Sequence, residues 1–175
     1  MESINWRMKQ ILFILLVLWV ESLQGQKNHN SILEEHIFQN LLAENKNLKE
    51  ILFSRDSFIY LDFWASWCGP CKNEIKYAKQ LKEQFKDLPI KYVYCSIDDK
   101  DQAWKQMIDK LEIRTSGEHW RISSKMAEKL LKHFEIYTIP RFMFLGKGGE
   151  IIDTDAPWPS EPYLKKFIIK NTKAQ

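Results

Sequence analysis

Cysteine, glycine and histidine are all scarce in this chain. Three cysteines among 175 residues are too few for a small secreted fold held together by several disulfides. Three of the six glycines lie close together, at residues 146–149. Because no helix pattern follows them, we predict a hairpin turn there and not a phosphate-binding loop. The four histidines, His29, His36, His119 and His133, are scattered without the spacing of metal ligands. We therefore expect no bound metal and no cofactor.

A large excess of charge of one sign is missing as well. The chain has 26 lysines and arginines against 23 aspartates and glutamates, for a net charge of +3, which is too small and too evenly spread for a nucleic-acid-binding surface. What is present is apolar and aromatic: 45% of the residues are hydrophobic, with seven tryptophans and ten phenylalanines. This composition predicts a packed core, and the length suits one domain, which we expect to be a monomer.

The first 25 residues have the pattern of an export signal. Arg7 and Lys9 precede an apolar run at residues 11–20, and small polar residues follow it. This order is typical of a secretory signal peptide, and the apolar run is short for a membrane span. An uncleaved N-terminal anchor is the alternative. Either segment would export the protein, to the periplasm or the outer face of a membrane.

We expect residues 26–52 to form a linker followed by a helical extension. Residues 26–30 are polar and are interpreted as the linker. Ser31 can cap a helix whose apolar residues are Ile32, Leu33, Ile37, Leu41 and Leu42. Residues 48–53 are interpreted as a second short helix or as the lead-in to the main domain.

Residues 53–173 predict an α/β domain. The nearly continuous apolar run at residues 58–64 is typical of a central strand buried on both faces. A helix with one apolar face follows, then a strand at 90–97, a helix capped by Asp98 or Asp99, a polar loop at 114–123 and a helix starting at Ser123 or Ser124. A hairpin at 141–145 and 150–153 and a last helix capped by Ser160 complete the chain. This order predicts a mixed central sheet with helices on both faces.

The sequence Trp-Cys-Gly-Pro-Cys at residues 67–71 joins the central strand to the helix after it. A cysteine at a helix N-terminus faces free backbone N–H groups and the positive end of the helix dipole, which stabilise a thiolate. We therefore expect Cys68 to be the exposed attacking thiol and Cys71, one turn into the helix, to resolve a mixed disulfide. A permanent disulfide and half of a zinc site are the alternatives, and the zinc site lacks a second pair of ligands.

Two stretches carry a resemblance to a known family. Residues 62–72 resemble thioredoxin, and residues 62–75 are more similar to the TlpA/ResA-like exported thiol-disulfide oxidoreductases. A second match, at residues 136–145, contains Pro140 where the thioredoxin superfamily has a cis-proline facing the cysteine pair. The resemblance covers about residues 53–167 and implies a thioredoxin-like fold.

The resemblance also implies roles for individual residues. Asp62, in an apolar strand, would act through water as a general base for Cys71; the alternative is a carboxylate bonded to nearby backbone or to Lys72. A cis Pro140 would place the backbone of Ile139 beside Cys68, where it could pair with an extended substrate. A trans proline is the alternative.

Further residues complete the predicted site or depart from the family. Trp67, with Gly69 and Pro70, would form part of the substrate-docking surface, although Trp67 could equally be a core residue. Glu74 matches TlpA-like proteins, but an exposed helix glutamate is the simpler interpretation. Lys76 stands where the family commonly has a helix-kinking proline, and Cys95 is expected to be a buried apolar residue, with a regulatory thiol as the alternative.

We interpret the chain as an exported thiol-disulfide oxidoreductase that reduces protein disulfides. The resemblance suggests apocytochrome c or another envelope protein as the substrate and a membrane thiol reductant as the electron donor. A disulfide oxidase or isomerase, and a redox-inert thioredoxin-fold binding module, are the alternatives.

Overall fold

The computed structural model describes residues 2–173, with side chains described for residues 8–26 and 31–173. Within these residues the strands are β1 (Ile37–Asn40), β2 (Asn45–Asn47), β3 (Phe58–Trp64), β4 (Ile90–Ser96), β5 (Glu118–Arg121), β6 (Arg141–Leu145) and β7 (Ile151–Asp153). The helices are α1 (Glu2–Glu35), α2 (Leu48–Leu52), α3 (Gly69–Gln84), α4 (Asp101–Lys110), α5 (Ser124–His133) and α6 (Tyr163–Lys173).

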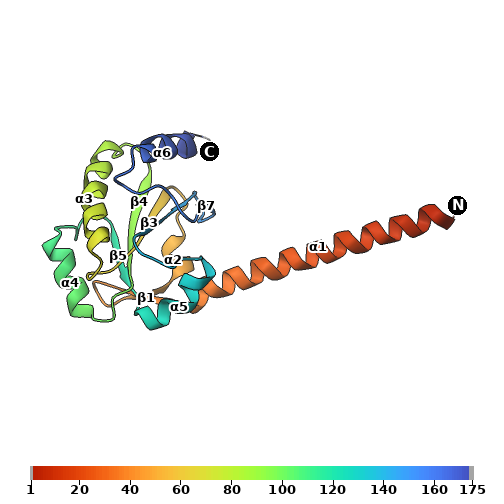
Figure 1. Cartoon of the computed structure of the whole chain (residues 1–175), viewed down its shortest axis with the longest axis horizontal. Coiled ribbons are helices and arrows are strands. Elements are labelled where there is room, and N and C mark those ends of the chain that lie inside the picture. The colour runs from red at the N-terminus through yellow and green to blue at the C-terminus, as the bar shows by residue number, and fades with distance from the viewer. Residues whose placement is uncertain (1, 174–175) are drawn as a thin grey trace.

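The strands form one mixed sheet in the order β2-β1-β5-β4-β3-β6-β7. β3 pairs in parallel with β4 and antiparallel with β6, and β4 pairs in parallel with β5. Figure 1 shows α3 and α4 on one side of the sheet and α2 and α5 on the other. The predicted mixed sheet with helices on both faces is confirmed.

The central position of β3 follows from its composition. All seven of its residues are buried, which is the pattern of a strand covered on both faces. On one face Tyr60 stacks on Phe142 of β6 and lies edge-on to Tyr92 of β4, with centroid separations of 5.3 and 6.1 Å. Because these rings are buried, β3 is held firmly in the sheet, and the turn that contains the two cysteines begins at its end.

The N-terminal helix is longer than predicted. α1 runs without a break from Glu2 to Glu35 and projects away from the sheet (Figure 1). Residues 26–30, which were predicted to be a polar linker, are helical, and Ser31 lies inside the helix and does not cap one. By length and composition alone, the stretch Met8–Glu35 could cross a membrane: its most apolar 18-residue window has a mean hydropathy of 1.4 and is not buried against the rest of the chain.

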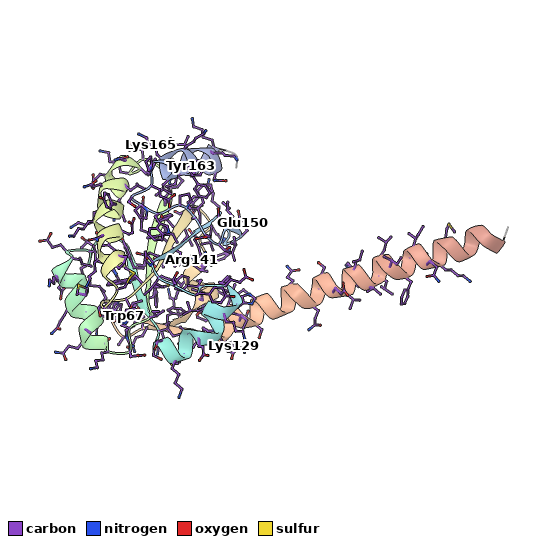
Figure 2. All side chains as sticks on the ribbon, in the orientation of Figure 1. Trp67, Lys129, Arg141, Glu150, Tyr163 and Lys165 are labelled. Carbon is purple, nitrogen blue, oxygen red and sulfur yellow. A yellow bond between two sulfur atoms is a disulfide. The ribbon has the colours of Figure 1, made fainter. Side chains whose placement is uncertain are left out.

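The end of α1 is joined to the domain by a few contacts. Leu33 is buried, and ion pairs of 2.7 and 2.6 Å join Glu34 to Lys49 and Glu35 to Lys129. In Figure 2, Lys129 lies where α5 meets this end of α1. These ion pairs are exposed, and each contributes little to stability. Together these contacts hold the C-terminal end of α1 against the sheet domain.

The predicted helix beyond Ser31 is replaced at residue 37 by a strand. In β1, Phe38 is fully buried while Ile37 is 43% exposed, and this alternation belongs to a strand. The side chain of Asn40 then accepts hydrogen bonds from the N–H groups of Leu42 and Glu44, each at 2.9 Å. This turn chemistry ends the strand and returns the chain into β2.

The polar loop predicted at residues 114–123 contains a strand instead. β5 lies between β4 and β1, so its backbone is paired on both edges. Gly117 precedes it because a Cβ there would lie 2.4 Å from the carbonyl oxygen of Tyr92. Two predicted helix caps are also wrong, since α4 begins after Lys100 without a side-chain cap. Asp98 and Asp99 bond to serines elsewhere.

Candidate functional site

The strand–turn–helix unit around the two cysteines forms as predicted. Cys68 is the N-cap of α3, and the N–H of Cys71 points at its sulfur with an N–S distance of 3.1 Å. Gly69 is the first residue of the helix, and Pro70 lies in its first turn, where its missing N–H costs no hydrogen bond. The sulfur of Cys68 thus lies where a helix N-terminus stabilises negative charge.

Cys68 and Cys71 form a disulfide with their Cα atoms 5.3 Å apart. Cys68 is 5% exposed and Cys71 is completely buried beneath α3. The predicted order of exposure is therefore confirmed, but Cys68 presents only a small part of its surface. An attacking group would reach Cys68 first, because Cys71 is shielded by the helix that carries it.

The cis-proline and the cysteines come from segments about 70 residues apart in the chain. The Ile139–Pro140 peptide bond is cis, as the resemblance implied. The carbonyl oxygen of Ile139 lies 3.7 Å from the sulfur of Cys68. Sheet pairing causes this contact: Phe63 near the end of β3 pairs with Arg141 at the start of β6. The residues just beyond these strand ends must then meet.

A groove with an apolar wall borders the disulfide. Its volume is about 320 Å³, and it is lined by Trp67, Ile97, Leu131, Ile136, Tyr137, Thr138 and Ile139. Trp67 is 64% exposed and Tyr137 is 79% exposed, so Trp67 is a surface residue and not a core residue; Figure 2 places it at the lower edge of the domain. Sequence reasoning did not assign Tyr137 to the site, although it lies two residues before Ile139.

Asp62 is 2% exposed, and neither of its carboxyl oxygens has a hydrogen-bond partner among the residues that the structure describes. The alternative in which it bonds to backbone or to Lys72 is therefore wrong, since Lys72 contacts the carbonyl oxygen of Ser66 instead. Burial, and secondarily the negative charge of Glu74, raise the pKa of Asp62 well above its ordinary value. A carboxyl group in this state holds its proton more tightly than an ordinary aspartate does.

Glu74 differs from its prediction. It is 7% exposed, not a solvated helix residue, and its carboxylate accepts hydrogen bonds from the backbone N–H and the hydroxyl of Ser160, both at 2.9 Å. Ser160 therefore does not cap the last helix, which begins at Tyr163. These hydrogen bonds hold the Glu74 side chain in place, and its negative charge is the second cause of the raised pKa of Asp62.

Two other predicted residues are buried away from solvent. Cys95 is fully buried, and burial raises the pKa of its thiol, which makes it a poor nucleophile and confirms the interpretation as an apolar core residue. His119 falls within the predicted polar loop at residues 114–123, but the structure places it in β5, where it is buried. It is stacked on Tyr94 at 4.9 Å, and burial lowers its pKa to about 4.

Comparisons with known proteins agree with this geometry. The profile of a family described as thioredoxin-like matches residues 56–151. A thiol-disulfide oxidoreductase ResA of Bacillus thuringiensis is 20% identical over 114 residues, covering 65% of this chain and 63% of the relative. The match thus spans less than two thirds of that relative's length. ResA of Bacillus subtilis is 22% identical over 140 residues, covering 79% of this chain and 75% of the relative.

Solved structures show the same fold. A solution structure from Bacteroides vulgatus superposes with a TM-score of 0.67 at 26% identity, covering 80% of this chain and 88% of that one. The thioredoxin domain of a thiol-disulfide oxidoreductase from the same species superposes with a TM-score of 0.65 at 18% identity, covering 78% and 91%. With the family match over more than half of its length and the cysteine pair in this setting, the chain belongs to the thioredoxin-like family.

Proposed function

We propose that this protein is an exported thiol-disulfide oxidoreductase that reduces disulfides in other exported proteins. The observation that carries the proposal is the position of Cys68. Its sulfur caps α3, lies 3.7 Å from the carbonyl oxygen of Ile139 and is joined to a buried partner three residues away. Relatives named thiol-disulfide oxidoreductases support the same chemistry.

The reaction begins from the reduced pair. The Cys68 thiolate, stabilised by the N–H of Cys71 and the helix dipole, attacks one sulfur of a substrate disulfide. A bond forms between Cys68 and that sulfur, the substrate S–S bond breaks, and the other substrate sulfur leaves as a thiolate that takes up a proton. The protein and substrate are then joined by one mixed disulfide.

Cys71 completes the exchange. Its thiol loses a proton, and the resulting thiolate attacks the sulfur of Cys68, which releases the second substrate thiolate and leaves the Cys68–Cys71 disulfide. The substrate gains two electrons and the protein loses two. Asp62 is proposed to receive the proton of Cys71 through water, because burial raises its pKa and so makes its carboxylate a stronger base than that of an ordinary aspartate.

The substrate is proposed to be an extended segment lying across Trp67, Gly69, Pro70 and Ile139. The exposed ring of Trp67 and the apolar wall of the groove would contact side chains of the segment. The backbone of Ile139 would pair with its main chain, as in an added strand. Apocytochrome c or another envelope protein would supply such a segment, and a membrane thiol reductant would return the pair to the dithiol form.

The reduction potential of the Cys68–Cys71 pair tests the direction of transfer. We expect a value below about −200 mV, closer to that of thioredoxin than to the strongest disulfide donors at about −120 mV. The measurement is equilibration with glutathione or dithiothreitol redox buffers, with the dithiol fraction counted by thiol labelling. A value at the oxidising end would instead assign an oxidase.

The location is tested by labelling in cells. A membrane-impermeant maleimide should label reduced Cys68 in intact cells or spheroplasts that express the full chain. Deletion of residues 1–25, which hold most of the exposed apolar part of α1, should abolish this labelling while lysates remain reactive. Equal labelling of the two forms in intact cells would contradict export by this segment.

A further inference from the structure

Ser66, two residues before Cys68, has every one of its polar groups engaged. Its N–H and its hydroxyl both donate to the carboxyl group of Asp98, at 2.9 and 2.6 Å. Its carbonyl oxygen accepts from the ammonium of Lys72, at 3.3 Å. A loop residue held at its donor, its acceptor and its side chain has little freedom to move.

Asp98 is the centre of this network. It is 2% exposed, and besides the two bonds from Ser66 it accepts a third, at 2.7 Å, from the hydroxyl of Ser96 at the end of β4. Its own N–H donates to the same hydroxyl at 3.0 Å, and its carbonyl oxygen accepts from Arg121 of β5 at 3.2 Å. A buried carboxyl group with this many donors is a rigid junction, because losing one donor leaves another group unsatisfied.

The junction lies directly beneath the reactive turn. Asp98 follows β4, which pairs in parallel with β3, and Ser66 follows β3. The next residues are Trp67, which is exposed, and Cys68, whose N–H donates to the carbonyl oxygen of Ala65 at 3.0 Å. Asp98 therefore holds one side of the turn to the sheet, while α3 holds the other.

We propose that Asp98 and Ser66 are positioning residues for Cys68, and that their hydrogen bonds keep its sulfur aligned with the N–H of Cys71 and beside Ile139. This inference rests on the proposed function, since it concerns the same sulfur. The network makes no direct contact with that sulfur and acts through the backbone of residues 66–68. Lys72 and Arg121 are the cations that hydrogen-bond to the junction, and both contact carbonyl oxygens of its members.

The consequence is chemical as well as structural. The N–H of Cys71 stabilises a Cys68 thiolate only while the sulfur stays close to it, at the 3.1 Å seen here. If the turn loosens, this charge-assisted hydrogen bond weakens and the Cys68 thiol holds its proton more tightly. A residue that served stability alone would change the unfolding temperature without changing the reactivity of this one thiol.

The test compares Ser66→Ala with Ser124→Ala. Ser124 is a matched control because its N–H and hydroxyl also donate to an aspartate, Asp99, at 3.0 and 2.9 Å, but in an exposed position and not in the residues that lead into Cys68. The measurement is the rate at which iodoacetamide alkylates Cys68 in the reduced protein across pH, read on the Cys68 peptide by mass spectrometry. Thermal unfolding is measured alongside.

We expect Ser66→Ala to slow alkylation of Cys68 at pH 7 about threefold, as for a thiol titration curve moved to higher pH by half a unit. Ser66→Thr, which keeps the hydroxyl, should restore most of the rate, and Ser124→Ala should match the wild type. If Ser66→Ala lowers the unfolding temperature but leaves the alkylation curve unchanged, the positioning role is refuted. A different result would contradict the proposed function itself: wild-type protein whose Cys68 is alkylated normally but which does not reduce disulfides.

Discussion

Replacing Cys71 with serine is expected to stop the protein at the mixed disulfide. Cys68 keeps its place at the start of α3, so it still attacks a substrate disulfide, but no second sulfur remains to release the product. Disulfide reductase turnover should fall by about a thousandfold or more, as when a catalytic nucleophile is removed. Substrates should accumulate as adducts that run at higher mass on non-reducing gels and disappear with dithiothreitol.

Two further variants make this result specific. Cys68→Ser should abolish both turnover and adducts, because the accessible sulfur is gone. Cys95→Ser is the matched control: this cysteine is buried in β4 and lies outside the exchange, so turnover should be unchanged. Adducts that persist in Cys68→Ser would show that another thiol attacks. Absence of both adducts and reductase activity would favour the redox-inert binding module.

Asp62→Asn is expected to change both stability and rate. Asp62 is buried without a hydrogen-bond partner, and burial raises its pKa in the folded state. The folded protein therefore holds this proton more tightly than the unfolded chain does. Its contribution to stability is complete below the unfolded pKa of about 4 and is lost as pH rises through the folded pKa. The asparagine variant lacks this titration, so its stability should fall less between pH 5 and pH 8 than that of the wild type.

The same variant should exchange more slowly. Without a carboxylate to receive the proton of Cys71, release of the mixed disulfide should slow by about a hundredfold near neutral pH, the usual scale for a general base. Denaturant unfolding at pH 5 and pH 8 measures the first effect, and single-turnover release of a trapped substrate measures the second. A stability that varies with pH as in the wild type would show that Asp62 does not titrate in this window.

Glu74→Gln separates the two causes of the Asp62 shift. Burial is the larger cause and the charge of Glu74 the smaller. Removing that charge should therefore move the pH-dependent loss of stability to lower pH without abolishing it.

Several features could be predicted from local sequence because local physics determines them. The uninterrupted apolar run at residues 58–64 forms the buried strand β3. Gly69 and Pro70 at the start of α3 shape the turn that carries the cysteines. Gly148 and Gly149, which have positive φ, form the hairpin turn between β6 and β7. The order in which Cys68 and Cys71 are exposed follows from helix geometry alone. The cis state of Pro140 came from the resemblance, since an isomer leaves no local signal.

Other features depend on partners far away in the chain. Glu74 resembles a solvated helix residue until Ser160, 86 residues later, is placed on it. Asp98 resembles a helix cap until Ser66, 32 residues earlier, takes both carboxyl oxygens. The short strand β5 contains charged residues and is recognisable only because β4 and β1 pair with its two edges.

The sequence by itself determined the chemistry of this protein: two thiols at a helix start, after a strand that must be buried. Tertiary structure alone decided the surroundings of those thiols, namely the carbonyl of Ile139 beside Cys68, the unpartnered carboxyl group of Asp62 and the junction at Asp98. The physical reason is that a side chain's preference for turn, strand or helix is local. Its burial and hydrogen-bond partners are set only when the sheet brings distant segments together.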